Sequence, residues 1–561
     1  MRAYIFSAMT AIVLAASLVN SNAIAADSQN EAVAVDRQFA PWDRPDSPGC
    51  VVAVSKDGRI AYNRGYGMAD LDHDVKITPN TIFYVGSISK QFTAAAILML
   101  AQDGKISLDD PVRKYIPELT DFGAPVTLRQ MLHHTSGLRD YEQLLWFDGW
   151  RLDSPDLLTD SDILYIMSRQ KELNFPPGSQ FDYSNTNYML LAQVVSRVSK
   201  QSFPDFMMTR LFQPLGMQHS HFRDDHGETV KNLAYPYEPK EDGGFDLSIP
   251  NYDTVGATNL LTTVDDLVRW DENFYTGKVG GRQLVTQLQE PGQLNDGTRL
   301  NYTEGMFVGG PGGIRIAESG SAGDAGYIAN ISRFPDQHLF VATLCNLGSI
   351  DPLDLSHRVA NIYLGGKLSA ALSAASGPEG SVRIDPKQSA AYAGTFVDRE
   401  KNLILRIDRR GEGLWAQWFI GPSSIDSQLE VLSQNRLRFP DLEEIDFGSD
   451  GNPSMTGKIS GQRPVPYIRV PEYKPTSTDL NEFAGKYSSN ELDTPYYVTL
   501  EEDNLVLHPP KMSERRLVAL TNDLFICDGM RVRFTRDPKE QVSGFLMSGR
   551  WNRVENVRFE R

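Results

Sequence analysis

The sequence predicts an α+β domain followed by two small all-β modules. The first two thirds of the chain mix strand-like apolar runs with segments of helical periodicity, which is typical of an α+β domain. Residues 368–387 are rich in Ala, Ser, Gly and Pro, and this composition indicates a linker. Beyond the linker, short alternating strands are separated by frequent turns, which indicates all-β modules.

The bulk composition limits the classes of function. The chain has 561 residues, more than one hydrophobic core usually holds, so several domains are expected. Its formal net charge of −17 argues against a nucleic-acid partner, because a phosphate backbone attracts a basic surface. Three cysteines, at positions 50, 345 and 527, do not make a disulfide framework. We expect Cys50 and Cys345 to be buried as small apolar side chains, and a bridge between them stays open.

The N-terminus has the pattern of a secretory signal peptide. Arg2 precedes an apolar run over residues 11–19, and Ala23-Ile24-Ala25 forms an A-x-A cleavage site. We therefore predict a signal peptide over residues 1–25 and an exported protein, either periplasmic or secreted. The apolar run is short for a membrane anchor, and no later segment predicts a transmembrane helix.

The first domain begins with a predicted β-hairpin. Residues 50–54 are apolar and strand-like, Asp57-Gly58 is a two-residue turn signal, and the return strand starts near Ile60. A helix is predicted after Lys90, because apolar residues recur at helical spacing up to the stop signal at Gly104. This helix is apolar on most sides, so we expect it to be central and buried.

Ser87 and Lys90 are the first candidate catalytic pair. They lie three residues apart at the start of this helix, so their side chains share one helical face. A serine hydroxyl becomes a good nucleophile when a neighbouring base takes its proton, and a lysine in apolar surroundings can be that base. The alternative interpretation of Ser87 is an ordinary N-capping serine.

Tyr183 and Asn185 are a second candidate pair. They follow a rigid turn at residues 175–178 and point the same way if the segment is extended. A phenol can relay a proton, and a side-chain amide can hold a substrate carbonyl or a lysine. The alternative is a packed ring and a helix cap.

Two histidine-containing segments raise the question of a metal. Adjacent His133 and His134 do not face each other on a helix, so we expect a helix end with one histidine hydrogen-bonded to the backbone. A polar segment holds a second set, which we interpret as solvated surface: His219, His221, Asp224, Asp225 and His226. We expect no metal and no cofactor.

Residues 314–323, 328–334 and 339–345 are the further strands predicted for this domain. The first runs into small residues, and a glycine-flanked edge strand lets a ligand backbone approach and pair with it. After the linker, residues 392–396 are echoed by residues 483–487, which indicates two related β modules. We predict barrel-like modules over residues 388–472 and 478–561.

Taken together, the motifs resemble the serine β-lactamase and penicillin-binding-protein superfamily, in its class C, D-aminopeptidase and esterase branch. The resemblance covers roughly residues 39–366, within a domain predicted over residues 36–367. It implies a β-lactamase-like fold, with a five-stranded antiparallel sheet flanked by helices, and the trailing modules are similar to the lipocalin-like pair of three-domain D-aminopeptidases. It rests on five motifs in the family's order, which are Ser87/Lys90 and the segments 132–138, 176–185, 214–217 and 256–260.

The resemblance also implies roles for the candidate residues. Ser87 is the expected acyl-accepting nucleophile, and Lys90 and Tyr183 are expected to act together as general base and general acid. Asn185 is expected to contact the substrate amide and Lys90.

The family's third motif falls at residues 318–320 and includes the one clear departure from the family pattern. The backbone N–H groups of Ser87 and Ser321 are the expected oxyanion hole. Ser319 and Gly320 are expected to line the substrate site. Glu318 stands where the family usually has Lys or His, and a carboxylate there would repel a substrate carboxylate and favour the charged form of Lys90. The alternative is that Glu318 points away from the site.

The expected function is that of an exported serine hydrolase that cleaves amide or ester bonds through an acyl-enzyme on Ser87. Its partner would be a small-molecule or peptide substrate, cationic or neutral because of Glu318. D-aminopeptidase-like or esterase-like activity is expected before β-lactamase or D,D-carboxypeptidase activity. A non-catalytic cell-wall-binding homologue and, third, a metalloenzyme are the other hypotheses, and the oligomeric state does not follow from the sequence.

Overall fold

The structure is a computed structural model that describes residues 29–561, apart from residues 151–155, 322–324, 377–390, 398–403, 412, 420–423, 434, 439–443, 449–451, 457–464, 472, 528–529 and 550–552. The signal peptide predicted for residues 1–25 lies outside the described residues. Within these ranges, none of the helices has both the length and the apolar character needed to cross a membrane.

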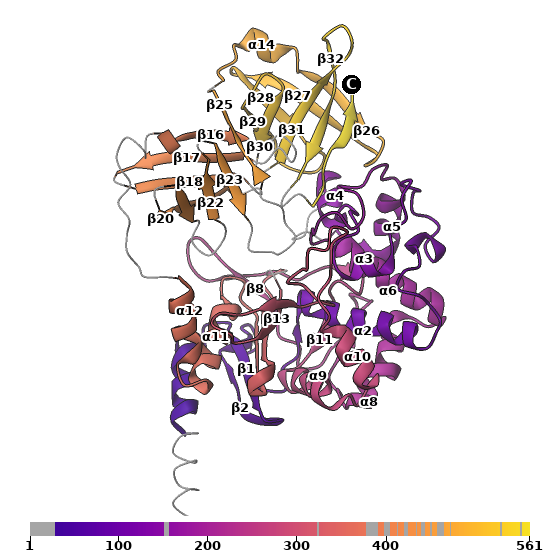
Figure 1. Cartoon of the computed structure of the whole chain (residues 1–561), viewed down its shortest axis with the longest axis vertical. Coiled ribbons are helices and arrows are strands. Elements are labelled where there is room, and N and C mark those ends of the chain that lie inside the picture. The colour runs from indigo at the N-terminus through magenta and orange to yellow at the C-terminus, as the bar shows by residue number, and fades with distance from the viewer. Residues whose placement is uncertain are drawn as a thin grey trace, which may run out of the picture.

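A six-stranded antiparallel sheet forms the centre of the first domain (Figure 1). It has one strand more than the five that were expected, because a short edge strand is added beside the strand of the third motif. The strands lie in the order β12 (Phe307–Gly309), β13 (Ile316–Gly320), β14 (Ile328–Phe334), β15 (Leu339–Cys345), β1 (Cys50–Lys56) and β2 (Arg59–Tyr66).

The predicted hairpin is confirmed. β1 pairs with β2, and the turn between them places Asp57 at φ 50° and Gly58 at φ 75°. Two consecutive positive φ values fit the tight hairpin turn that Asp-Gly favours.

The two faces of the sheet belong to different hydrophobic clusters. Val51 and Ala53 of β1 pack with the core of α2 (Ser89–Gln102), whereas Val52 and Val54 pack with α11 (Pro352–Tyr363). Side chains alternate between faces along a strand, so each strand residue can be assigned to the α2 face or the α11 face. Helix α2 is buried from Ser89 to Leu100, as predicted for a central helix.

Cys50 and Cys345 form a disulfide. They are register partners on the neighbouring strands β1 and β15, and both are buried. The expectation that they are separate apolar side chains is therefore corrected, and the bridge that the sequence left open is present.

Removing this disulfide should destabilise the first domain. A bridge between residues 295 positions apart restricts the unfolded chain strongly, so replacing both cysteines by alanine should cost about 2–5 kcal/mol of unfolding free energy. Urea denaturation with and without reductant measures this effect. Reductant should shift the transition of the wild type and leave that of the double variant unchanged; a wild type insensitive to reductant would contradict the prediction.

The predicted linker and the first β module differ in detail from expectation. Helix α12 (Lys367–Ser376) occupies the beginning of the segment that was predicted as linker, and residues 377–390 are outside the described part. The module that follows contains two five-stranded sheets, which run from β16 (Gly394–Val397) to β25 (Ile468–Val470).

The C-terminal module is a closed eight-stranded barrel, as predicted for a barrel-like module. Its interior is filled by aromatic rings, among them Tyr487, Phe534 and Phe545. The strands are β26 (Gly485–Ser489), β27 (Thr494–Glu501), β28 (Asn504–His508), β29 (Arg515–Ala519), β30 (Leu524–Cys527), β31 (Met530–Arg536), β32 (Val542–Ser548) and β33 (Val557–Glu560).

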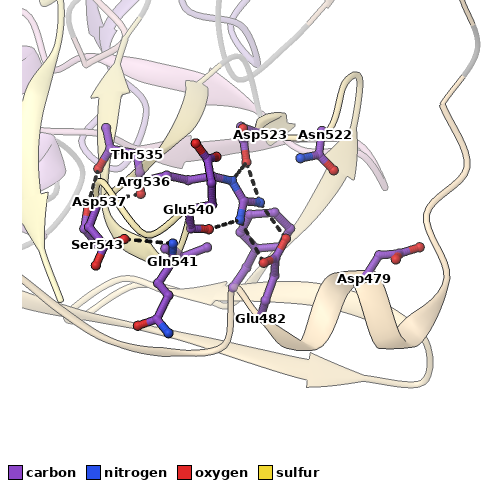
Figure 2. A network of polar contacts seen from close by, with 12 residues as sticks. Asp479, Glu482, Asn522, Asp523, Thr535, Arg536, Asp537, Glu540, Gln541 and Ser543 are labelled. Atoms are coloured by element: carbon purple, nitrogen blue, oxygen red, sulfur yellow. Dashed lines mark hydrogen bonds and ion pairs between the residues drawn. The ribbon is translucent and has the colours of Figure 1, made fainter.

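Arg536 closes one end of this barrel (Figure 2). Its guanidinium donates hydrogen bonds to Glu482 at 2.9 Å and 2.5 Å, to Asp523 Oδ1 at 3.0 Å and to the carbonyl of Glu540 at 2.8 Å. Glu482 follows the short helix α14 (Ser477–Asn481), so Arg536 ties this helix to two hairpin turns. Among the described residues, all the hydrogen bonds that Arg536 donates go to residues of the same module, so Arg536 stabilises this end of the barrel.

The other end of the barrel packs against the first domain near α4 (Tyr141–Phe147), and Figure 1 shows the two side by side. The Tyr496 hydroxyl donates to the carbonyl of Phe147 at 2.6 Å, and a buried ion pair joins Arg139 to Glu491. Apolar residues of both modules belong to one hydrophobic cluster. The barrel is therefore part of the packed structure around the first domain.

Candidate active site

Ser87 lies on a short 3-10 turn between a strand and the buried helix. β5 (Phe83–Tyr84) pairs with β11 (Leu260–Thr262), and the turn Gly86–Ile88 follows directly and leads into α2. Gly86 has φ 50°, a conformation that glycine adopts readily. Ser87 is partly exposed although its neighbours are buried, so its hydroxyl is accessible to a substrate.

Lys90 is fully buried and has three hydrogen-bond acceptors. Its Nζ lies 2.9 Å from Ser87 Oγ, 2.7 Å from Asn185 Oδ1 and 3.1 Å from the carbonyl of Ala257. The predicted contact of Ser87 with Lys90 and that of Asn185 with Lys90 are therefore both present. Ala257 belongs to the predicted 256–260 motif, which lies against α2. This arrangement holds the amine next to the hydroxyl that it would activate.

Asn185 begins helix α6 (Asn185–Ser199), and its position is fixed by a residue that sequence reasoning missed. Its backbone N–H donates to Asp140 Oδ2 at 2.6 Å, which leaves its side-chain oxygen directed at Lys90. Asp140 is fully buried. A buried carboxylate 45 residues away has no local sequence signal that would reveal this role.

Tyr183 lies beside Lys90 with its ring rather than in a direct hydrogen bond. The Lys90 Nζ is 4.8 Å from the centre of the Tyr183 ring, and the same ring lies tilted against His134 with the ring centres 4.3 Å apart. The contact with Lys90 keeps Tyr183 a candidate for proton transfer, and its partial exposure places it where a substrate can reach it.

His134 is a neutral structural residue. Its Nδ1 accepts hydrogen bonds from the Ser184 N–H at 3.1 Å and from Asn187 Nδ2 at 3.2 Å, so Nε2 carries the proton toward the Tyr302 hydroxyl. Burial, followed by the charges of Lys90 and Arg553, holds the pKa of His134 well below its usual range. Both ring nitrogens therefore have protein partners.

Three further histidines of the metal hypotheses have separate partners. His133 Nδ1 lies 3.0 Å from the carbonyl of Arg129, and His221 Nε2 lies 3.3 Å from Glu228. His226 and Asp225 do approach Asp253, but this group lies at the surface and its His226 ring is held by Asp253 at 3.0 Å. This placement agrees with the interpretation of the second set as surface.

Glu318 does not face Ser87. Its carboxylate accepts a hydrogen bond from Ser332 Oγ at 2.8 Å and pairs with His357 Nε2 of α11 at 2.5 Å. On the same strand, Ile316 packs in the α11 cluster and Ala317 in the α2 cluster. Glu318 thus points to the α11 face, and its predicted contact with substrate is corrected. Burial opposes the charged form of His357, but the hydrogen bond and charge of Glu318 outweigh it and raise the pKa of His357.

Replacing Glu318 by glutamine should therefore leave the substrate preference unchanged. Because the side chain lies on the face opposite Ser87, we expect kcat/KM on a cationic and on an anionic substrate to stay within about twofold of wild type. The loss of an ion pair whose side chains are both 25% exposed should cost no more than about 1 kcal/mol of stability. Steady-state kinetics on the two substrates measures the effect, and a tenfold change in their ratio would return Glu318 to the site.

Ser319 and Gly320, the other two residues of the third motif, differ in exposure. Ser319 lies on the α2 face and is buried, and Gly320 is exposed at the end of β13. In the described structure, β12 pairs with residues 316–318 of β13 and does not extend to residues 319–320. The outer edge of β13 is therefore unpaired by β12 at residues 319–320. The Ser321 N–H, however, donates to the carbonyl of Ala329 at 2.9 Å within the sheet. The prediction that this N–H points into an oxyanion hole is corrected, and the Ser87 amide stays a predicted donor for that role.

Arg553 of the C-terminal barrel lies beside Tyr183, and no pattern in the sequence indicates this contact. Its guanidinium carbon lies 5.6 Å from the centre of the Tyr183 ring. Its backbone carbonyl accepts the Asp140 N–H at 2.8 Å, next to the carboxylate that holds Asn185. The first domain alone therefore does not contain all the side chains around Tyr183.

A serine paired with a buried lysine at the start of a central helix, beside an antiparallel sheet, is typical of a class of serine hydrolases. The sequence model of the family described as Beta-lactamase matches residues 35–362, and the chain belongs to this family. The resemblance inferred from the ordered motifs is confirmed.

The chain is also similar to proteins named D-aminopeptidase. The D-aminopeptidase of Cereibacter sphaeroides strain ATCC 17029 is 25% identical over 452 residues, which covers 80% of each chain. The D-aminopeptidase of Gluconobacter oxydans strain 621H is 26% identical over 446 residues, again 80% of each chain. These relatives extend beyond the first domain, so the protein is a D-aminopeptidase-like serine hydrolase at the level of family.

Solved structures share the fold. An octameric penicillin-binding protein homologue from Pyrococcus abyssi matches with a TM-score of 0.54 and 22% identity, covering 77% of this chain and 98% of its own. The D-amino acid amidase from Ochrobactrum anthropi SV3 matches with a TM-score of 0.51 and 20% identity, covering 61% of this chain and 99% of its own. At these identities the likeness concerns the fold alone.

Proposed function

We propose that this protein hydrolyses amide or ester bonds of small-molecule or peptide substrates through an acyl-enzyme on Ser87, with D-aminopeptidase-like or esterase-like activity. The observation that carries the proposal is the 2.9 Å contact between Lys90 Nζ and Ser87 Oγ, at a partly exposed serine. The similarity to D-aminopeptidases over 80% of both chains supports the substrate class.

In the proposed reaction, Lys90 takes the proton of Ser87 while Ser87 Oγ attacks the substrate carbonyl. The Ser87 N–H, on the 3-10 turn that leads into α2, stabilises the negative charge on that carbonyl oxygen. Asn185 orients Lys90, and Tyr183 relays the proton that Lys90 took from Ser87 to the leaving group as the acyl-enzyme forms. Water then attacks the acyl-enzyme by the same proton path and releases the acid.

The buried disulfide supports an exported location, periplasmic or secreted. Disulfides persist in oxidising compartments and are rare in the bacterial cytosol. The Cys50–Cys345 bridge within the central sheet is what a protein folded outside the cytosol would keep.

A fluorophosphonate probe tests the nucleophile. The wild type should become covalently labelled on Ser87, and Ser87→Ala should lose labelling and at least about a thousandfold in kcat/KM. The matched control is Ser369→Ala, which removes an exposed hydroxyl on α12 far from the site. Labelling that persists in Ser87→Ala would refute the proposal.

A hydrolysis panel tests the class of substrate. The panel contains a D-aminoacyl anilide, a short acyl ester and a cephalosporin, each assayed with wild type and Ser87→Ala. We expect turnover of the first two to exceed that of the cephalosporin. Dominant cephalosporin hydrolysis would favour a β-lactamase, and binding of peptidoglycan fragments without turnover would favour a non-catalytic homologue.

A further inference from the structure

Hydrogen bonds to the first domain hold the backbone of Arg553, which belongs to the C-terminal barrel. It lies in the connection between β32 and β33 of the barrel, and its carbonyl accepts hydrogen bonds from the Asp140 N–H at 2.8 Å and from Asn174 Nδ2 at 3.0 Å. Two residues on, the Glu555 N–H donates to Asn174 Oδ1 at 2.9 Å. The backbone that carries Arg553 is therefore fixed on the first domain.

The guanidinium of Arg553 has unused donors. It is half-buried over the Tyr183 ring at 5.6 Å, yet within the described residues it donates no hydrogen bond and forms no ion pair. This contrasts with Arg139 and Arg531, two arginines nearby in the structure that each pair with a carboxylate. A partly desolvated guanidinium with five N–H donors is well suited to bind a planar anion in a bidentate manner.

The carboxylates around Arg553 do not supply that anion. Asp140 Oδ2 accepts the Asn185 N–H at 2.6 Å, and Glu142 and Asp182 have contacts of their own. Burial opposes the charged form of Arg553. The electrostatic effects of nearby groups outweigh burial and raise the pKa of Arg553; these groups are Asp140, Glu142, Tyr183 and Asp182. Arg553 therefore stays a cation, with its donors directed at no protein acceptor in the described structure.

We propose that Arg553 binds a carboxylate on the leaving group of the substrate, so that the preferred substrate is an acylated amino acid or peptide with a free carboxylate. This inference rests on the proposed function, in which Tyr183 protonates the leaving group. A group stacked on Tyr183 then lies on the leaving-group side of the scissile bond. The position of Glu318 on the opposite face removes the negative charge that would have opposed such a substrate.

The reaction is an ordinary acyl transfer. Ser87 Oγ forms a bond to the acyl carbon, the bond from that carbon to the leaving nitrogen breaks, and the proton taken from Ser87 ends on that nitrogen. The released product is an amino acid or peptide whose carboxylate was held by Arg553. Water then forms the second product, the free acid of the acyl group.

Matched leaving groups test this proposal. The acyl group that the wild type hydrolyses fastest is attached to D-alanine and, separately, to D-alaninamide, which differ only in the charge of the carboxyl end. Wild type should prefer the D-alanine compound. Arg553→Ala should lower kcat/KM for it by about 10- to 100-fold, mainly through KM, and change the amide compound by less than about twofold. Arg553→Lys should recover part of the loss, because it keeps the charge and loses the bidentate geometry.

Arg516→Ala is the matched control, since it removes an exposed barrel arginine that contacts Asn504 and is remote from Tyr183. An equal loss on both compounds in Arg553→Ala would overturn the proposal and assign Arg553 a structural role. So would a wild type that hydrolyses the amide compound at least as fast. Failure of the proposed function gives a different result, in which Ser87 takes no probe and neither compound is cleaved.

Discussion

Replacing Lys90 by methionine should lower kcat/KM by about a thousandfold or more on every substrate that the wild type hydrolyses. Methionine retains most of the apolar stem and removes the amine that lies 2.9 Å from Ser87 Oγ. Without a base at this distance, the Ser87 hydroxyl keeps its proton during attack. The rate of fluorophosphonate labelling should fall in parallel, because labelling needs the same activated oxygen.

The variant must be shown to fold, since Lys90 also bonds Asn185 Oδ1 and the Ala257 carbonyl. Circular dichroism and the urea midpoint provide this check, with a loss of about 1–3 kcal/mol expected from the two buried acceptors left without a donor. Lys105→Met is the control, because Lys105 is exposed just after the same helix and should keep full activity. A folded Lys90→Met enzyme with wild-type labelling would show that another group is the base.

The contacts that the sequence predicted correctly are those with a local or periodic cause. Ser87 and Lys90 are three residues apart, and helical geometry alone brings them together. The hairpin turn at Asp57 follows from the conformational preference of the Asp-Gly pair. The burial of α2 follows from its apolar composition on all sides.

The side of the sheet on which Glu318 lies could not be predicted from the motif. The strand was predicted correctly, but the face of a strand residue changes with every single step along the chain. Ile316 and Glu318 lie on the α11 face of the sheet, and Ala317 lies on the α2 face. The motif at residues 318–320 predicts a substrate contact for Glu318, but it does not determine the face on which the side chain lies. The pairing of Ser321 with Ala329 could not be predicted either, because it depends on register between strands.

Contacts between modules have no sequence signal at all. Arg553 approaches Asp140 and Tyr183 only because the barrel docks on the first domain, and neither composition nor periodicity reports a docking geometry. The sequence predicts two β modules after the first domain but does not indicate how they pack against it. In the structure, the C-terminal barrel contributes Arg553 to the surroundings of Tyr183.

This docking depends on a buried ion pair, and breaking it should have the largest effect on stability. Arg139 and Glu491 are 1% and 6% exposed at their side chains and lie 2.5 Å apart. Replacing Glu491 by leucine leaves a buried guanidinium without its counter-charge, which should cost about 3–5 kcal/mol of unfolding free energy. Gln170, which also accepts from Arg139 at 2.9 Å, is neutral and cannot replace the carboxylate.

Asp493→Asn is the matched control in the same connection of the barrel. Asp493 is 66% exposed and lies 3.6 Å from Arg169, so its loss should change stability by less than about 0.5 kcal/mol. Combining Glu491→Leu with Arg139→Met should restore much of the lost stability, because no charge is then left buried. Urea denaturation of the four proteins measures these differences, and a Glu491→Leu variant within 1 kcal/mol of wild type would contradict the prediction.

Activity should follow the ion pair as well, for a structural reason. Arg139 directly precedes Asp140, whose backbone N–H bonds the Arg553 carbonyl and whose carboxylate holds Asn185. If the barrel moves away from Arg139, the support of Asn185 and hence of Lys90 weakens. We therefore expect slower labelling of Ser87 in Glu491→Leu at urea concentrations where the first domain is still folded, and wild-type labelling in Asp493→Asn. Equal labelling rates in both would show that the barrel contributes to stability without supporting the nucleophile.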